Sequence, residues 1–352
     1  MKAHAYVLAR PGAPVVREDR DLADPAPGEV IVEVHACGLC HTDLGFAEGS
    51  VAPRHPLPLV LGHEITGVVC AAGRGVEALD GATVLVPAVM PCGECAFCRA
   101  GRGNACPKQK MPGNDIDGGF ATHVRVPGSA LVNLARRPES VRLDALSVVA
   151  DAVSTAWQAV RRSGLERGDV AFVVGGGGVG GFVAQIARSL GAHVVVCDVH
   201  ASRLESVRAL GVERAVDVRG RDPRDVRKEL HGLAQDRGVA SLGWRVFECS
   251  GTAAGQSLAY GLLAQAATMV VVGFTREAVN VRLSNLMAFD ATVHGSWGCP
   301  VEEYPAVLER IYLGEVVIEP FIERAPMSRI DELLGALARH ELTRRMVLDP
   351  RA

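Results

Sequence analysis

The spacing of hydrophobic residues along the chain changes near residue 145. Before that point, short apolar runs rich in β-branched residues, at 29–38, 57–73 and 80–89, are separated by turns that contain glycine and proline. Short strands with frequent turns are typical of an irregular, mostly β domain. We therefore expect the first part of the chain to form such a domain.

Beyond residue 145 the apolar residues follow the period of helices as well as that of strands. Residues 143–164 have helical spacing and end at Gly164, and a strand, a glycine-rich turn, a helix ending at Gly191 and a second strand follow. Further strand-like runs lie at 244–251 and 267–274. Alternating strands and helices favour an α/β domain with a doubly wound parallel sheet.

Length and composition fit a soluble globular protein of two domains. The chain has 352 residues, 48% of them hydrophobic, and its net charge is only −3, which argues against a nucleic-acid-binding protein. No apolar run approaches the ~20 residues of a membrane span, and the N-terminal residues lack the features of a signal peptide. We expect a cytoplasmic protein whose ten cysteines serve metal binding or catalysis rather than disulfides.

Four cysteines lie close together in one glycine-containing segment, at Cys92, Cys95, Cys98 and Cys106. Four thiolates on a tight loop can close a tetrahedron around zinc and leave no coordination position open. The alternatives are four unrelated buried cysteines or an iron–sulfur cluster, which also uses short cysteine spacings. A closed zinc site of this kind holds a loop in place and performs no chemistry.

A glycine-rich turn with the pattern GxGxxG, formed by Gly175, Gly177 and Gly180 with Gly178 and Val179 between the last two, joins an apolar strand to an amphipathic helix. In that context the pattern predicts a dinucleotide site, because glycines let the backbone approach a pyrophosphate at the helix N-terminus. Asp198 ends the second strand, where a carboxylate accepts hydrogen bonds from the adenosine ribose and repels a 2′-phosphate, so NAD is favoured over NADP. The alternative is a turn that binds nothing.

The segment CGLCHTD at residues 37–43 has three interpretations. Cys-x-x-Cys occurs in redox dithiols, in halves of zinc fingers and in catalytic sites. With a nicotinamide site predicted, Cys40, His63 and Asp151 would make a three-ligand zinc centre with an open fourth position. Taken alone, however, His63 could simply be packed between apolar residues, and Asp151 could be a helix cap or an ion-pair partner.

CGLCHTD, GHEITG, the four-cysteine segment, and VVGGGGVGG followed by Asp198 resemble the zinc-dependent medium-chain alcohol dehydrogenases in order and spacing, over essentially the whole chain. The resemblance implies a GroES-like, mostly β catalytic domain of residues 1–150 plus 295–352 and a Rossmann NAD-binding domain of residues 151–294. It also implies NAD, a catalytic zinc on Cys40, His63 and Asp151, a structural zinc on the four cysteines, and a homodimer or homotetramer. Cys37 would then be only a neighbour, and no redox pair.

The resemblance assigns catalytic roles to Thr42, which would bind the substrate oxygen and pass its proton on, to Asp43, which would orient His63, and to Glu64, behind the metal. It assigns cofactor contacts as follows: His41 and Arg345 at the pyrophosphate, Arg203 at the adenosine ribose, and Val272, Ser296 and Trp297 at the nicotinamide. Two positions depart from the family pattern. Asp151 stands where many members have cysteine, and Gly45 stands where classical members have a proton-relay histidine, so the proton must leave by another route.

Four stretches, at 110–127, 147–153, 243–251 and 283–300, resemble the 6-hydroxycyclohex-1-ene-1-carbonyl-CoA dehydrogenases of anaerobic benzoyl-CoA degradation. That resemblance implies oxidation of a ring secondary alcohol on an acyl-CoA thioester to the 6-oxo product. The cations available for the CoA phosphates are Arg54, Arg99, Arg102, Lys108 and Lys110, unless each is an ordinary solvated charge. The alternatives are a conjugated enoyl-CoA reductase, a generic secondary-alcohol or polyol dehydrogenase, and a non-enzymatic zinc-ribbon module that binds nucleic acid.

Overall fold

The computed structural model describes residues 1–352, which form two compact units. Unit 1 comprises Met1–Ser154, Gly298–Tyr312 and Ile322–Ala352, and unit 2 comprises Thr155–Trp297 and Leu313–Phe321. These boundaries differ from the expected ones chiefly because residues 313–321 return to the second unit. None of the helices has the length and apolar character needed to cross a membrane.

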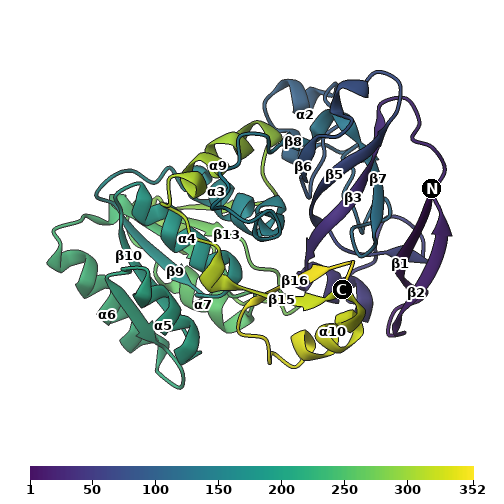
Figure 1. Cartoon of the computed structure of the whole chain (residues 1–352). Helices are drawn as coiled ribbons and strands as arrows, with labels where there is room; N and C mark the ends of the chain where they lie inside the picture. The colour runs from purple at the N-terminus through teal and green to yellow at the C-terminus, as the bar shows by residue number, and fades with distance from the viewer. The chain divides into compact units, whose positions relative to one another are not determined.

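Unit 1 is built on two sheets (Figure 1). The smaller sheet has the order β2-β1-β4, formed by β1 (Lys2–Leu8), β2 (Val15–Asp21) and β4 (Leu59–Val60). The larger sheet has the order β15-β16-β3-β5-β6-β8, with β7 paired to β3; its strands are β3 (Glu29–Gly38), β5 (Glu64–Ala72), β6 (Thr83–Val86), β7 (His123–Pro127), β8 (Val132–Asn133), β15 (Ile322–Pro326) and β16 (Arg345–Asp349).

Antiparallel pairing of β3 with β5 brings the segment that follows β3 beside the segment that precedes β5. Gly38 lies opposite Glu64 and Cys37 opposite Ile65 in this register. Because a one-residue slip would turn every side chain to the other face, the buried valines and isoleucines of both strands fix the register. Cys40 and His63, which are 23 positions apart in the sequence, therefore lie close together.

Short helices connect the strands of unit 1 and cover its core. They are α1 (His41–Glu48), α2 (Ala96–Arg99), α9 (Tyr304–Tyr312) and α10 (Ile330–Ala338), with 3-10 turns η1 (Glu77–Leu79), η2 (Gly103–Ala105), η3 (Gly128–Ala130), η4 (Ala145–Ala150), η6 (Val301–Glu303) and η8 (Met327–Arg329). The core beneath them combines aliphatic side chains from both sheets with Phe46 and Phe120.

Unit 2 contains a six-stranded, wholly parallel sheet of order β11-β10-β9-β12-β13-β14 (Figure 1). Its strands are β9 (Val170–Val174), β10 (His193–Asp198), β11 (Arg214–Asp217), β12 (Trp244–Glu248), β13 (Thr268–Val271) and β14 (Thr292–Gly295). In sequence order this arrangement is 3-2-1-4-5-6, whose direction reverses between β9 and β12, and nucleotides bind at such a point. The expected α/β fold, a GroES-like β domain with a Rossmann domain, is confirmed.

The helices of unit 2 are α3 (Ala152–Ser163, which begins in unit 1), α4 (Gly178–Ser189), α5 (Ala201–Ala209), α6 (Pro223–Asp236), α7 (Ala253–Gly261) and α8 (Ser284–Phe289), with 3-10 turns η5 (Ser241–Gly243) and η7 (Glu319–Phe321). All five residues of β9 are buried. This continuous burial explains why the central strand is an unbroken apolar run rather than an alternating one.

The structure divides the single helix expected over residues 143–164. A 3-10 turn, η4, ends at Ala150, Asp151 leaves helical geometry with φ −133° and ψ −66°, and α3 begins at Ala152. Tertiary hydrogen bonds replace the helical ones here: the Ala150 carbonyl accepts from the Tyr304 hydroxyl, and the Ala152 amide donates to Glu64. Periodicity alone does not reveal these bonds, and the break they produce falls on the predicted zinc ligand.

Candidate functional site

Four potential metal ligands converge in unit 1. Cys40 follows β3 and caps α1, His63 directly precedes β5, Glu64 begins β5, and Asp151 occupies the break between η4 and α3. One ligand atom of each lies within 4.8 Å of the others. The pairing of β3 with β5 and the break before α3 therefore assemble one cluster from three remote segments.

The geometry of this cluster fits a zinc ion. Asp151 Oδ2 lies 3.6 Å from Cys40 Sγ and 3.6 Å from His63 Nε2. Ligands bound to zinc at about 2.0–2.3 Å in a tetrahedron are about 3.3–3.8 Å apart. His63 is 1% exposed, yet neither ring nitrogen has a hydrogen-bond partner of good geometry, and a buried polar atom in that state calls for a ligand. A metal ion meets that need at Nε2.

Asp43 holds two of these ligands in place from behind. Its fully buried carboxylate accepts from the Cys40 amide (3.0 Å) and from the Gly62 amide (3.0 Å), and Oδ1 lies 3.3 Å from His63 Nδ1. A carboxylate at Nδ1 fixes the histidine tautomer that presents Nε2 to the metal. The structure thus places Asp43 where the proposed orienting role requires it.

The electrostatics of the cluster favour a cation. Burial disfavours the charged imidazole of His63, but Asp43, Asp151 and Cys40 outweigh that effect and raise the pKa of His63 well above its ordinary value. Burial also raises the pKa of Glu64, to about 7, despite the opposing charge of Arg345. Negative groups that attract a proton in a buried site also attract a divalent metal ion.

Arg345, the residue expected at the cofactor pyrophosphate, has a partner within unit 1. Its buried guanidinium pairs with Glu64 Oε1, which also accepts from the Ala152 amide at 3.2 Å. A buried carboxylate needs such a partner to avoid the cost of an isolated charge. Glu64 Oε2 has no hydrogen-bond partner, so this buried carboxylate is held through Oε1 alone.

The other expected catalytic side chains lie at the start of α1. Thr42 Oγ1 is 3.7 Å from Cys40 Sγ, which places the hydroxyl beside the metal cluster. His41 is exposed as the first residue of α1. Gly45 has no side chain, and the Ser50 hydroxyl, which donates to the Gly45 carbonyl at 3.0 Å, fills the space beside it.

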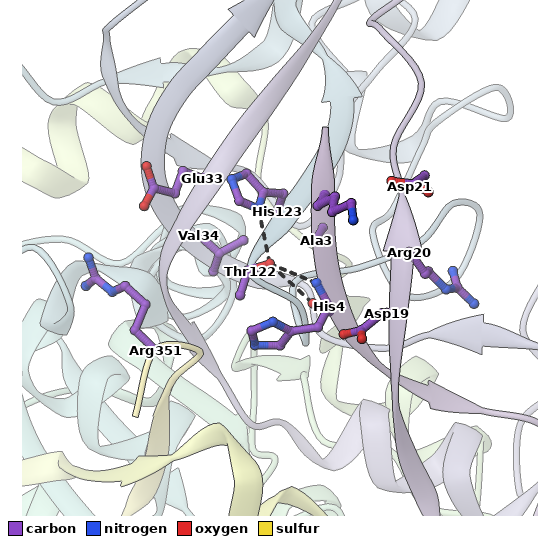
Figure 2. A pocket seen from close by; sticks show the side chains of 11 residues that line it. Ala3, His4, Asp19, Arg20, Asp21, Glu33, Val34, Thr122, His123 and Arg351 are labelled. Atoms are coloured by element: carbon purple, nitrogen blue, oxygen red, sulfur yellow. Dashed lines mark hydrogen bonds between the residues drawn. The ribbon is translucent and has the colours of Figure 1, made fainter.

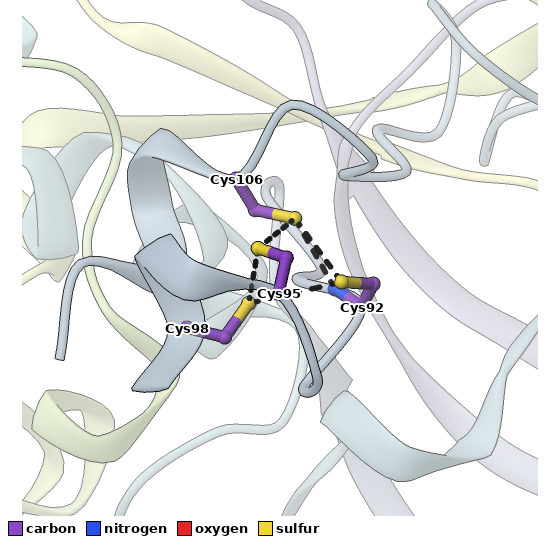
Figure 3. A group of neighbouring side chains, drawn as sticks. All are labelled: Cys92, Cys95, Cys98 and Cys106. Carbon is purple, nitrogen blue, oxygen red and sulfur yellow. Dashed lines mark hydrogen bonds between the residues drawn. The ribbon is translucent and has the colours of Figure 1, made fainter. Parts of the chain in front are cut away.

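Figure 3 shows the four-cysteine segment folded around a common centre. The nearest sulfur pairs are Cys95–Cys98 at 3.4 Å, Cys92–Cys106 at 3.5 Å, Cys95–Cys106 at 3.7 Å and Cys92–Cys98 at 3.9 Å. All four thiols are free, and these separations match four thiolates around one zinc ion with bonds of about 2.3 Å. Sulfurs this close cannot enclose a cluster of several iron atoms. This is the structural zinc site.

The glycine turn of unit 2 has the conformation that a dinucleotide requires. Gly175 follows β9 with φ +97°, and a Cβ there would lie 2.7 Å from Ser250 Cα. A Cβ on Gly180 would lie 1.7 Å from the Gly175 carbonyl oxygen, so only glycine fits. Gly177 caps α4, whose first residues are Gly178 and Val179. The α4 N-terminus therefore offers free amides to a pyrophosphate.

Asp198 ends β10, next to the glycine turn. Its nearly buried carboxylate accepts from the Gly176 amide at 2.7 Å and the His200 amide at 2.8 Å. Arg203 lies 3.8 Å from Asp198 Oδ2, and its guanidinium covers Gly177. These contacts place the carboxylate at the end of the strand, as the predicted ribose contact requires.

The residues expected at the nicotinamide lie at the opposite half of the same sheet edge. Val272 follows β13, and its amide donates to the Glu248 carbonyl. Ser296 follows β14 and donates from its amide to the Val271 carbonyl, while its hydroxyl has no partner; Trp297 beside it is 53% exposed. All three thus follow the carboxyl ends of parallel strands, on the edge where ligands bind.

Sequence reasoning missed two buried acidic residues. Glu248 ends the apolar strand β12 with no exposed surface, and Asp144, which caps η4, pairs with Arg142 and Arg324. A charged residue inside an apolar strand pattern is the signal that would have drawn attention to Glu248. Asp144 offered no such signal, because its partner Arg324 is 180 positions away.

A separate polar pocket of about 470 Å³ lies on unit 1 (Figure 2). It is lined by Lys2, Ala3, His4, Asp19, Arg20, Asp21, Glu33, Val34, Thr122, His123 and Arg351. Two of its cations already have partners, since Arg20 pairs with Asp117 and Arg351 contacts His35. No ligand atom of either metal cluster lines this pocket, so it is distinct from the chemistry described above.

Comparison with known proteins agrees with this geometry. Residues 26–136 match the model of the alcohol dehydrogenase GroES-like domain, and residues 178–312 match that of the zinc-binding dehydrogenases. The chain is 31% identical over 309 residues to a 2-dehydro-3-deoxy-L-galactonate 5-dehydrogenase of Pseudoalteromonas atlantica (87% of each chain), and 28% identical over 324 residues to an alcohol dehydrogenase of Geobacillus stearothermophilus (91% of each).

Among solved structures, the alcohol dehydrogenase of Aeropyrum pernix is similar with a TM-score of 0.89 and 28% identity, over 99% of this chain and 100% of that one. These likenesses extend along both units, through the two zinc clusters and the glycine turn. The protein is an oxidoreductase that acts on CH–OH groups with a nicotinamide cofactor and zinc, and it belongs to the zinc-dependent medium-chain alcohol dehydrogenase family.

Proposed function

We propose that this protein oxidises a secondary alcohol to a ketone with NAD, at a zinc ion held by Cys40, His63 and Asp151. The observation that carries the proposal is that Cys40 Sγ, His63 Nε2 and Asp151 Oδ2 converge on one point, while the buried Nε2 has no hydrogen-bond partner. Asp151 fits the third position better than Glu64 does, because Glu64 is engaged by Arg345, whereas the Asp151 side chain is 22% exposed. Solvent and substrate can therefore reach the cluster beside Asp151.

The preference for NAD rests on Asp198. Its carboxylate is fixed by two backbone amides at the end of β10, in the position where a Rossmann sheet presents an acidic group to the adenosine ribose. A fixed negative charge there repels the 2′-phosphate of NADP. Arg203, 3.8 Å away, offsets only part of that charge.

The chain's own groups account for binding, orientation and proton removal. When bound, zinc would supply Lewis-acid polarisation of the alcohol oxygen. Thr42 would accept the alcohol proton, since its hydroxyl lies beside Cys40 Sγ. Asp43 holds the Cys40 backbone and the His63 ring in position through its two carboxylate oxygens. Gly45 provides no side chain for onward transfer, so the proton would pass to water, to a cofactor ribose hydroxyl or to another side chain.

Turnover of metal-site variants tests this assignment. Cys40→Ala and Asp151→Ala should abolish NAD reduction while NADH still binds, because the glycine turn is formed by unit 2 alone. The metal content of each purified variant must be measured in parallel. Near-normal rates in a variant shown to lack the metal would refute the proposed ligand set.

For the substrate class, the relatives support a polyol or another simple secondary alcohol. Two proteins that resemble the chain, from Pseudoalteromonas atlantica and Escherichia coli, are named for dehydrogenation at position 5 of galactonate compounds, at 31% and 27% identity. We therefore favour an alcohol or polyol substrate.

A cyclic hydroxyenoyl-CoA, 6-hydroxycyclohex-1-ene-1-carbonyl-CoA, is the second candidate. It is favoured by the four stretches at 110–127, 147–153, 243–251 and 283–300, whose sequences resemble those of dehydrogenases for that thioester. Of the cations suggested for its phosphates, Arg54 pairs with Asp115 and Lys108 with Glu94, while Arg99 donates to the Glu94 carbonyl. Arg102 and Lys110 are exposed. Because three of these five cations already have partners, a CoA substrate has weaker support than a simple alcohol or polyol.

A rate comparison separates the candidates. NAD reduction should be measured with simple secondary alcohols, with L-galactonate, and with the cyclic hydroxyenoyl-CoA beside its free acid. Higher kcat/KM for the alcohols supports our preferred class, whereas a thioester that exceeds its free acid by about 100-fold would support the CoA substrate. NADH oxidation by an enoyl-CoA that lacks the ring oxygen would instead indicate a conjugated enoyl-CoA reductase.

For the oligomer, we propose a homodimer formed through the edge of the unit 2 sheet. β14 is paired only with β13, and its residues Thr292 and Val293 are exposed. Nearby in sequence, Leu283 and Met287 are 69% and 78% exposed, and neighbouring large apolar side chains with so much exposed surface are typical of an interaction site. An unprotected edge strand can pair with another copy. Light scattering should show a dimer that Val293→Lys weakens; a monomeric wild type would refute the proposal.

A further inference from the structure

Glu248 occupies the point at which the strand order of unit 2 reverses. It is the last residue of β12, which lies between β9 and β13, and it pairs in register with Val174 and Val271. The glycine turn follows β9 directly, and the segment expected at the nicotinamide follows β13. Glu248 therefore lies under the place where the two halves of a dinucleotide meet.

The contacts of this carboxyl group are unequal. Oε1 accepts from the Ser250 amide (2.8 Å), the Ser250 hydroxyl (2.6 Å) and the Gly251 amide (3.1 Å), whereas Oε2 has no partner although the side chain is 0% exposed. Burial of the unpartnered Oε2 is costly, and an apolar residue at position 248 would pack in β12 without that cost. What the carboxyl group adds is therefore its hold, through Oε1, on the loop of residues 249–251.

The loop held by Glu248 supports both neighbouring segments. A Cβ on Gly175 would lie 2.7 Å from Ser250 Cα, so the glycine turn rests directly on this backbone. On the other side, a Cβ on Gly273 would lie 2.3 Å from the Gly251 amide nitrogen and 2.7 Å from Glu248 Oε2. Any shift of residues 249–251 would therefore displace both segments.

We propose that Glu248 is a positioning residue for NAD, acting through residues 249–251 to set the spacing between the glycine turn and Val272–Phe274. The inference rests on the proposed NAD-dependent function. It predicts that Glu248 matters for a ligand that spans both segments and hardly matters for one that occupies only the adenosine end. That end is served by Asp198 on β10, on the far side of β9.

Binding of NADH and of AMP to the purified protein tests the proposal. Glu248→Ala removes the carboxylate oxygen that accepts from the Ser250 amide, the Ser250 hydroxyl and the Gly251 amide. It should raise the Kd for NADH about tenfold while the Kd for AMP changes less than twofold. Glu248→Gln keeps one acceptor oxygen and should fall between wild type and Glu248→Ala. Glu166→Gln, an exposed change before β9, is the matched control and should leave both constants unchanged.

The outcomes are distinguishable. Equal weakening of NADH and AMP, or unchanged binding of both with only a lower Tm, would assign Glu248 a purely structural role and overturn the inference. If Glu248→Ala does not fold, Glu248→Asp decides, because its shorter side chain withdraws the carboxylate from Ser250 and Gly251: a threefold or larger rise in the Kd for NADH alone supports the inference, and a smaller change overturns it. Failure of the wild type to bind NADH would refute the proposed function itself.

Discussion

Replacement of Asp43 by asparagine should weaken the catalytic zinc site without removing any ligand. The two carboxylate oxygens of Asp43 serve the Cys40 amide, the Gly62 amide and His63 Nδ1. Asparagine has one acceptor oxygen, so its amide group must face either Cys40 or the pair of Gly62 and His63. In both orientations, at least one buried donor loses its acceptor.

The expected size of the effect follows from these contacts. A buried amide without an acceptor costs about 1–3 kcal/mol, and loss of a carboxylate behind a metal-binding histidine typically reduces metal affinity about 10–100-fold, or about 1.4–2.7 kcal/mol. We therefore expect Asp43→Asn to lower the free energy of unfolding by about 1–3 kcal/mol. Its catalytic zinc should be released at correspondingly lower chelator concentrations.

Chelator competition and thermal unfolding measure the two effects separately. Asp24→Asn, a change of the same chemistry at an exposed position of unit 1, is the control and should match wild type in both assays. Zinc retention in Asp43→Asn within twofold of wild type would show that Asp43 does not orient His63. The four-cysteine zinc provides an internal reference, since none of these contacts reaches it.

Three further predictions concern other parts of the chain. Asp198→Asn removes the charge that repels a 2′-phosphate and should lower the ratio of kcat/KM for NAD to that for NADP about 10–100-fold; an unchanged ratio would remove Asp198 from cofactor selection. Cys95→Ser should reduce the metal content from two zinc ions to one and open the loop to trypsin at Arg99 and Arg102, and full retention of both ions would contradict the structural site. Burial opposes ionisation of Asp144, but Arg142 and Arg324 hold its pKa well below the usual 3.8. Its contribution to stability is therefore present above about pH 4 and lost as the pH falls further, so the Tm advantage of wild type over Asp144→Asn should shrink in acid; a constant advantage would exclude the charged pair as its source.

The parts of the site that follow from local geometry could be predicted from sequence. The glycine turn and the four-cysteine segment each depend on residues close together in the chain, and the alternation of strands and helices that predicts a parallel sheet is also a local pattern. All three features are found in the structure. The grouping of Cys40, His63 and Asp151 came from resemblance, because only the β3–β5 register and the break before α3 bring them together.

What sequence could not provide was the partner of each buried charge. The pairing of Glu64 with Arg345 spans 281 positions, and that of Asp144 with Arg324 spans 180. No periodicity relates such residues, and the family resemblance indicated only a pyrophosphate contact for Arg345. The helix expected over 143–164 failed for a similar reason, since distant polar groups compete for its backbone hydrogen bonds.

The oxygen that Asp151 brings to the metal cluster has a consequence for handling the protein. A thiolate, an imidazole and a carboxylate form a mixed ligand set, which discriminates less sharply among first-row transition metals than a set richer in sulfur. The ion that is loaded will thus reflect the growth medium and the purification buffers. Preparations with identical sequences can differ in specific activity for that reason alone, and metal analysis of each batch should precede any comparison of rates.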